Sequence, residues 1–107
     1  LRAVIHSGEE IEMIGVVATI KTKPGAGADF EATAKRLVEA VNANEPGCLF
    51  YRLFRTENEN EYRFLEAYKD MDAVQAHRAS DHFRTIGKEM GAFMDGPPDV
   101  TRMEGAE

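Results

Sequence analysis

Apolar residues along the chain follow two different periodicities, and these periodicities predict the order of the secondary-structure elements. The apolar, β-branched run at residues 14–21 is typical of a strand. From about residue 28 to residue 43, Phe30, Ala34, Leu37 and Val41 recur at helical spacing, while charged residues occupy the opposite face. Turn-forming residues at 23–27 and 44–47 end these two segments. The first half of the chain is therefore predicted to be a strand followed by an amphipathic helix.

The second half of the chain shows two further strands, a helix with a break, and a short last strand. Residues 48–55 and 61–68 are strand-like and flank a polar stretch, 56–60, that suits a hairpin loop. Asp70 is a good N-cap for a short helix, and Ser80 or Asp81 can cap a second helix that reaches about Met94. Gly96 and the two prolines after it precede a strand expected at residues 100–103.

This order of elements, βαββαβ with a broken second helix, predicts a ferredoxin-like α+β fold. Right-handed crossovers place the strands in a four-stranded antiparallel sheet with the helices on one face. Apolar residues occupy both alternating sets of the first three strands, so the uncovered face should also be apolar. A second copy packed sheet to sheet is the simplest partner, which predicts a homodimer.

Length and charge narrow the class of protein. With 107 residues, the chain fits a single domain, expected at residues 13–103. Residues 1–12 are expected to be an N-terminal arm or a vector-derived segment. The net charge of −6, without a basic patch, argues against nucleic acid or an anionic membrane as partner. No apolar run approaches the roughly 18 residues of a transmembrane helix. A single cysteine, Cys48, fits a reducing cytoplasm.

Two ionisable residues stand out as candidates for chemistry. Glu66 alternates with Phe64 and Tyr68 and should share their face of the strand, whereas His77 lies among small residues such as Ala73 on one helical face. If the strand and helix pack together, Glu66 would orient His77 as a general base. The structural alternatives are a capping histidine and a glutamate in a salt bridge at the sheet edge.

Aromatic residues are candidates for binding a substrate. Tyr51 and Tyr68 could donate hydrogen bonds to a substrate oxygen and stabilise an anion. Phe64 and Phe83 are candidates for lining an aromatic cavity. For all four residues, the competing interpretation is an ordinary place in the hydrophobic core.

No metal, nucleotide or nucleophilic-cysteine site is predicted. His77 and His82 are five residues apart, off the helical spacing of three or four that places two ligands on one face, and a helix break is expected between them. His82 is expected at the surface. Cys48 has no pKa-lowering neighbour in its local sequence, so it is expected to be a small buried residue. The glycines near Lys23 lack a phosphate-loop or dinucleotide fingerprint.

Five pieces of sequence follow one another between Met13 and Phe83: Lys23-Pro24-Gly25, the helix with Phe30 and Leu37, Glu45-Pro46-Gly47-Cys48-Leu49-Phe50-Tyr51, Glu66-Ala67-Tyr68-Lys69-Asp70, and His77-x-x-Ser80-x-His82-Phe83. In these pieces and in their order, the chain resembles the antibiotic biosynthesis monooxygenase family of dimeric α+β barrels.

The resemblance implies one of several activities. The family includes cofactor-independent monooxygenases that use molecular oxygen on quinols and anthrones, an isomerase of the phosphorylated autoinducer-2 signal, and heme-degrading oxygenases. The stretch from Glu66 to His77 especially resembles the isomerase. The heme-degrading members use a tryptophan near the end of the short helix, and this chain has no tryptophan. We therefore expect a cofactor-free, metal-free monooxygenase of a small aromatic substrate, and the alternatives are an isomerase of a small carbonyl compound or a non-catalytic binding module.

Overall fold

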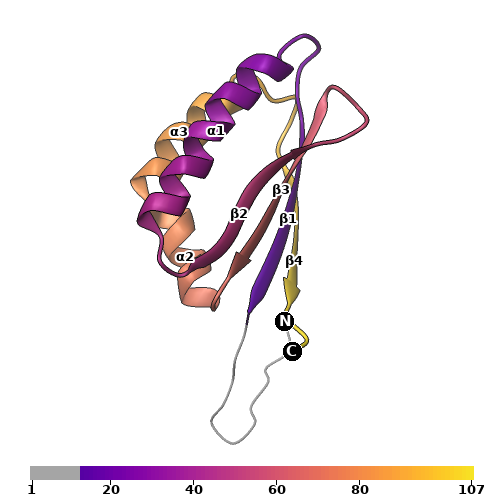
Figure 1. The fold of residues 1–107 in the computed structure, drawn as a ribbon. Helices are drawn as coiled ribbons and strands as arrows, with labels where there is room; N and C mark the ends of the chain where they lie inside the picture. Colours follow the sequence, from indigo (N-terminus) through magenta and orange to yellow (C-terminus); the bar gives the residue numbers. More distant parts are fainter. Residues whose placement is uncertain (1–12) are drawn as a thin grey trace, which may run out of the picture.

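A computed structural model describes residues 13–107 as a four-stranded antiparallel sheet with three helices on one face (Figure 1). The sheet order is β2-β3-β1-β4. The elements in chain order are β1 (Ile14–Lys21), α1 (Gly27–Asn44), β2 (Cys48–Arg55), β3 (Glu61–Tyr68), α2 (Met71–Ala79), α3 (Asp81–Gly91) and β4 (Asp99–Glu104). The predicted ferredoxin-like architecture is confirmed. The expectation for residues 1–12 lies outside the described residues.

The core lies between the sheet and the helices. Alternate residues of β1, among them Ile14 and Ile20, are buried on the helix-covered face, as the period of a strand requires. Phe30 and Leu37 of α1 are buried against this face, and the ring of Phe30 lies 5.1 Å from that of Tyr62 in β3. Helix α1 therefore forms where its predicted apolar stripe meets the inner side of the sheet.

Side-chain caps set the ends of the two short helices. The Asp70 carboxylate accepts a hydrogen bond from the backbone N–H of Ala73 and so begins α2. The Ser80 hydroxyl oxygen accepts one from the N–H of Phe83, which caps α3, while the extended backbone of Ser80 ends α2. Helix α3 ends at Gly91 rather than near Met94, because Met94 pairs with Thr22 in an isolated β-bridge.

The opposite face of the sheet is uncovered in the single chain (Figure 1). The register pairs Phe50 with Ala67 and Phe54 with Arg63, so both phenylalanines point away from the buried Tyr51. Phe50 and Phe54 are each 41% exposed, and Met103 of β4 is 44% exposed. The apolar second face predicted from the sequence is therefore present. Among the described helices, none is both long and apolar enough to cross a membrane.

Candidate functional site

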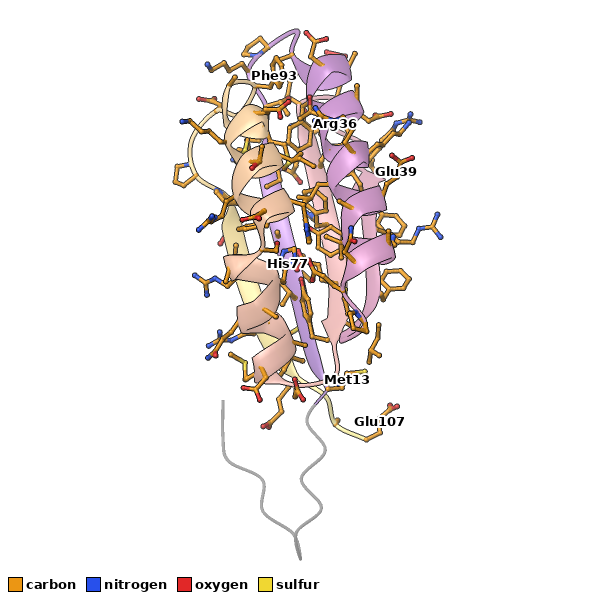
Figure 2. All side chains as sticks on the ribbon, turned by 90° about the vertical axis from the view of Figure 1, so that its left-hand side faces the viewer. Met13, Arg36, Glu39, His77, Phe93 and Glu107 are labelled. Carbon is orange, nitrogen blue, oxygen red and sulfur yellow. The ribbon has the colours of Figure 1, made fainter. Side chains whose placement is uncertain are left out.

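Glu45, His77 and His82 come from the ends of three helices and lie close together beneath the helical layer. Glu45 is the C-cap of α1, where Pro46 prevents the helix from continuing. His77 lies in the last turn of α2, and His82 lies in the first turn of α3. Figure 2 shows His77 near the middle of the molecule, between α1 and the column formed by α2 and α3. The break at Ser80 thus brings two histidines to one carboxylate.

The Glu45 carboxylate contacts both imidazole rings. Its two oxygens lie 3.1 and 3.0 Å from Nδ1 of His77, and Oε2 also lies 2.5 Å from Nε2 of His82. Because an ionised carboxylate can only accept hydrogen bonds, the pairing gives His77 a proton on Nδ1 and His82 a proton on Nε2. In its neutral form, His77 then carries its basic lone pair on Nε2, which has no hydrogen-bond partner within residues 13–107.

Aromatic rings enclose His77. Ring centroids of Tyr51, Tyr68 and Phe83 lie 5.2, 5.5 and 4.6 Å from the imidazole. His77 is only 4% exposed. Burial lowers the pKa of His77, and the nearby Glu45 carboxylate opposes this shift only in part. The neutral imidazole is therefore favoured near neutral pH, in the state that can accept a proton.

Glu66 does not take the place predicted for it. It shares the helix-facing side of β3 with Phe64 and Tyr68, as expected, but its carboxylate accepts a hydrogen bond of 2.7 Å from the Tyr68 hydroxyl. The carboxylate that contacts the His77 ring is Glu45. Burial raises the pKa of Glu66 to about 7, so this carboxyl group can hold a proton near neutrality.

The other predicted residues fall into two groups. Tyr51, Tyr68 and Phe83 surround His77, and both tyrosines are also buried members of the hydrophobic core. Phe64 is buried in the core, with its ring 5.3 Å from that of Tyr51.

Burial raises the pKa values of Tyr51 and Tyr68 well above the ordinary value, so each hydroxyl remains a hydrogen-bond donor. Within residues 13–107, the Tyr51 hydroxyl has no hydrogen-bond partner.

Two expectations about single residues have different outcomes. His82 is not an ordinary surface residue, because its ring contacts Glu45 and its side chain is only 19% exposed. Cys48 is half-buried, and desolvation raises the pKa of its thiol to about 11. A thiol with a raised pKa is a poor nucleophile, which agrees with the structural role expected for Cys48.

Glu45 is the functional candidate that sequence reasoning missed. The motif that begins with Glu45 contributed to the family resemblance, but no role followed from it. Glu45 lies 32 residues from His77 and 37 from His82, so neither helical nor strand periodicity connects them. A carboxylate placed directly before Pro-Gly was the available signal, since such a residue sits at a helix end and can face the site.

The same three residues make up a group of potential metal ligands. One ligand atom from each of Glu45, His77 and His82 lies within 4.8 Å of the others. The sequence had argued against this pair of histidines because their spacing fits no single helix. The break expected between the histidines is present at Ser80, but the two helices that it separates bring both rings to one carboxylate.

Fold and site together define a class of small α+β proteins with a buried, carboxylate-bound histidine beneath aromatic residues. The sequence matches the family named antibiotic biosynthesis monooxygenase over residues 13–89, and the chain belongs to this family.

Individual relatives agree with the family match. The chain is 30% identical over 95 residues to "Putative monooxygenase YcnE" of Bacillus subtilis, an alignment that covers 89% of this chain and 100% of the relative. A Caulobacter crescentus CB15 crystal structure, described under the same family name, superposes with a TM-score of 0.87 at 43% identity, covering 91% of this chain and 92% of that one. A Methanosarcina mazei structure gives a TM-score of 0.79 at 29% identity and covers 86% and 91%.

Proposed function

We propose that the protein is a cofactor-independent monooxygenase that oxidises a small quinol- or anthrone-like aromatic substrate with molecular oxygen. The observation that carries the proposal is the buried His77, whose Nδ1 is held by Glu45 and whose Nε2 has no partner within residues 13–107. Membership of a monooxygenase family supports the reaction class. The aromatic rings around His77 support an aromatic substrate.

His77 is the proposed general base. Its Nε2 accepts the proton of a phenolic or enolic hydroxyl, and the resulting imidazolium is stabilised by the Glu45 carboxylate 3.0 Å from Nδ1. The substrate anion is electron-rich and can pass an electron to molecular oxygen. Glu45 acts here as a positioning residue, a role that the sequence had assigned to Glu66.

Tyr51 is the proposed partner of the substrate anion. Its hydroxyl is protonated and has no hydrogen-bond partner within residues 13–107, whereas the Tyr68 hydroxyl already donates to Glu66. A donor directed at a developing oxyanion stabilises the transition state for proton transfer. The ring of Phe83, 4.6 Å from the imidazole, would contact the aromatic substrate.

The isomerase alternative receives less support from the structure. A phosphorylated substrate would need basic residues around His77, such as Arg52, Arg63, Arg84 or Lys88. All four are exposed, and Arg52 and Arg63 lie on the uncovered face of the sheet. Arg84 pairs with Asp81 at the surface. A non-catalytic binding module is the other alternative, and the enclosure of His77 is the observation in its favour.

Oxygen uptake with a panel of dihydroquinones and anthrones tests the proposed function. The chain is first treated with a chelator, and no metal or flavin is added. We expect uptake by the wild type, and we expect His77→Ala to reduce the rate on the order of 100-fold or more, the usual contribution of a general base. Arg78→Ala, at the exposed neighbouring position, is the matched control and should retain the rate. Equal uptake by His77→Ala would overturn the assignment of the base.

If no substrate of the panel supports oxygen uptake, the isomerase and the non-catalytic binding module are tested next. Turnover of a small hydroxyketone that requires His77 would establish the isomerase. Binding without turnover would establish the non-catalytic module.

We also propose that two chains associate through the uncovered face of the sheet. Phe50, Phe54 and Met103 expose apolar surface on this face, and a second copy is the simplest way to bury it. Sedimentation at micromolar concentration should give twice the chain mass. A mass near 11.9 kDa would refute the dimer.

A further inference from the structure

We propose that Glu45, His77 and His82 bind a divalent transition-metal ion of the zinc type, and that this ion and the base function of His77 exclude each other. The three ligands come from the C-cap of α1, the last turn of α2 and the first turn of α3. Metal binding itself does not depend on the proposed function. The mutual exclusion of metal and base function rests on the proposed function, because it concerns the proton that His77 would accept.

The positions of the ligand atoms suit a small ion. One ligand atom from each residue lies within 4.8 Å of the others, and Oε2 of Glu45 lies 3.0 Å from Nδ1 of His77 and 2.5 Å from Nε2 of His82. Zinc binds histidine nitrogen and carboxylate oxygen at roughly 2.0–2.2 Å, so tetrahedral ligands lie roughly 3.3 Å apart. The two histidine–carboxylate pairs therefore need to widen by less than an ångström to admit the ion, and the group as a whole already lies within 4.8 Å.

The chemistry of the ligand set favours zinc over calcium or magnesium. Two imidazoles and one carboxylate are the three-ligand set of open zinc sites, which leave a fourth position for water. Calcium and magnesium instead prefer a shell of oxygen ligands. The His82 side chain is 19% exposed, against 5% for His77 and 9% for Glu45. Solvent and ion can therefore reach the group from the His82 side.

Metal binding would change which His77 nitrogen carries the proton. Without metal, Nδ1–H donates to Glu45 and the lone pair is on Nε2. A neutral imidazole that binds metal through Nδ1 must carry its proton on Nε2, so the proton is relocated within the ring and none is lost. The Nε2 atom then cannot accept a proton from a substrate. A bound zinc ion would thus inhibit a reaction that uses His77 as base.

Calorimetric titration of the chelator-treated full chain with Zn²⁺ alone tests the site. We expect saturable binding of one ion per chain, and Co²⁺ should give the intense visible absorption of a four-coordinate centre. His82→Gln removes one ligand and should weaken Zn²⁺ binding by more than 10-fold, since even residues that only support ligands contribute about 10- to 100-fold. Asp81→Asn changes the exposed carboxylate beside His82 and should retain wild-type binding.

The outcomes separate the two parts of the proposal. Absence of saturable binding, or equal binding by the wild type and by a folded His82→Gln variant, would overturn the metal site. Specific binding that leaves oxygen uptake unchanged would uphold the site and overturn the exclusion. If no substrate supports oxygen uptake, the proposed function fails. The exclusion is then tested by NMR, which should show the His77 proton moving from Nδ1 to Nε2 when Zn²⁺ binds, and a proton that stays on Nδ1 would overturn it.

Discussion

Replacing Glu45 with glutamine should change the ionisation of His77, and this prediction tests the central contact of the site without a known substrate. Glutamine keeps the shape of the side chain but removes its charge. The Glu45 carboxylate lies 3.0 Å from Nδ1 of His77, so it stabilises the imidazolium form and opposes the effect of burial. Without this charge, burial dominates, and the pKa of His77 should fall further below its ordinary value.

The structure supplies the size of the effect. Coulomb's law gives about 5.5 kcal/mol for unit charges 3.0 Å apart at an effective dielectric constant of about 20. This is an upper bound, because the side chains relax and solvent reaches His82. Opposite charges this close usually move a pKa by about 1 to 3 units. A titration resolves a change of that size.

NMR of ¹⁵N-labelled protein measures both the pKa and the tautomer of each imidazole. The chain has only three histidines, so His77 and His82 can be assigned with one substitution each. We expect the wild type to carry the His77 proton on Nδ1. Glu45→Gln should lower the pKa of His77 and shift the ring toward the Nε2–H tautomer, because the glutamine amide can donate to Nδ1.

Glu66→Gln is the matched control, because it makes the same Glu-to-Gln change in another carboxyl group close to the aromatic residues of the site. The Glu66 carboxylate bonds to Tyr68 and not to His77, so the tautomer of His77 should stay the same. If Glu66→Gln shifts the His77 titration more than Glu45→Gln does, the assignment of Glu45 as the orienting carboxylate is wrong. An unchanged His77 in the Glu45→Gln variant would refute it equally.

Three further predictions concern stability and are measured by urea unfolding. Burial raises the pKa of Glu66 from 4.5 to about 7, so the folded protein holds this proton more tightly than the unfolded chain. The protonated Glu66 carboxyl group therefore contributes its full stability below about pH 4.5, and this contribution is lost as the pH rises through 7. The unfolding free energy of Glu66→Gln minus that of the wild type should be larger at pH 8 than at pH 4, by about 2–3 kcal/mol. If this difference is the same at both pH values, the reasoning is wrong. Phe30→Ala should cost about 3–5 kcal/mol, because Phe30 is fully buried, and a loss below about 1 kcal/mol would place it outside the core. Ser80→Ala should cost about 1 kcal/mol through loss of the α3 cap to Phe83, and an unchanged midpoint would argue against that cap.

The sequence itself determined the fold and its elements, because the signals involved are local. Alternation in β1, the helical spacing from Phe30 to Val41, and the caps at Asp70 and Ser80 each act within a few residues. Local periodicity fixes which face of an element is apolar, and the apolar faces leave few ways to pack a chain with this order of elements. The helix-facing side of β3 that carries Glu66 and Tyr68 follows from the same alternation.

Only the tertiary structure decided which charged groups meet. Glu45, His77 and His82 belong to separate elements, and the spacing of His77 and His82 argued against a joint role. The end of α1 and the break at Ser80 place all three in one small volume. The packing of α1 against α3 and of α2 against the sheet sets these distances. No local pattern records such a meeting, because the distance between side chains on different elements depends on how those elements pack.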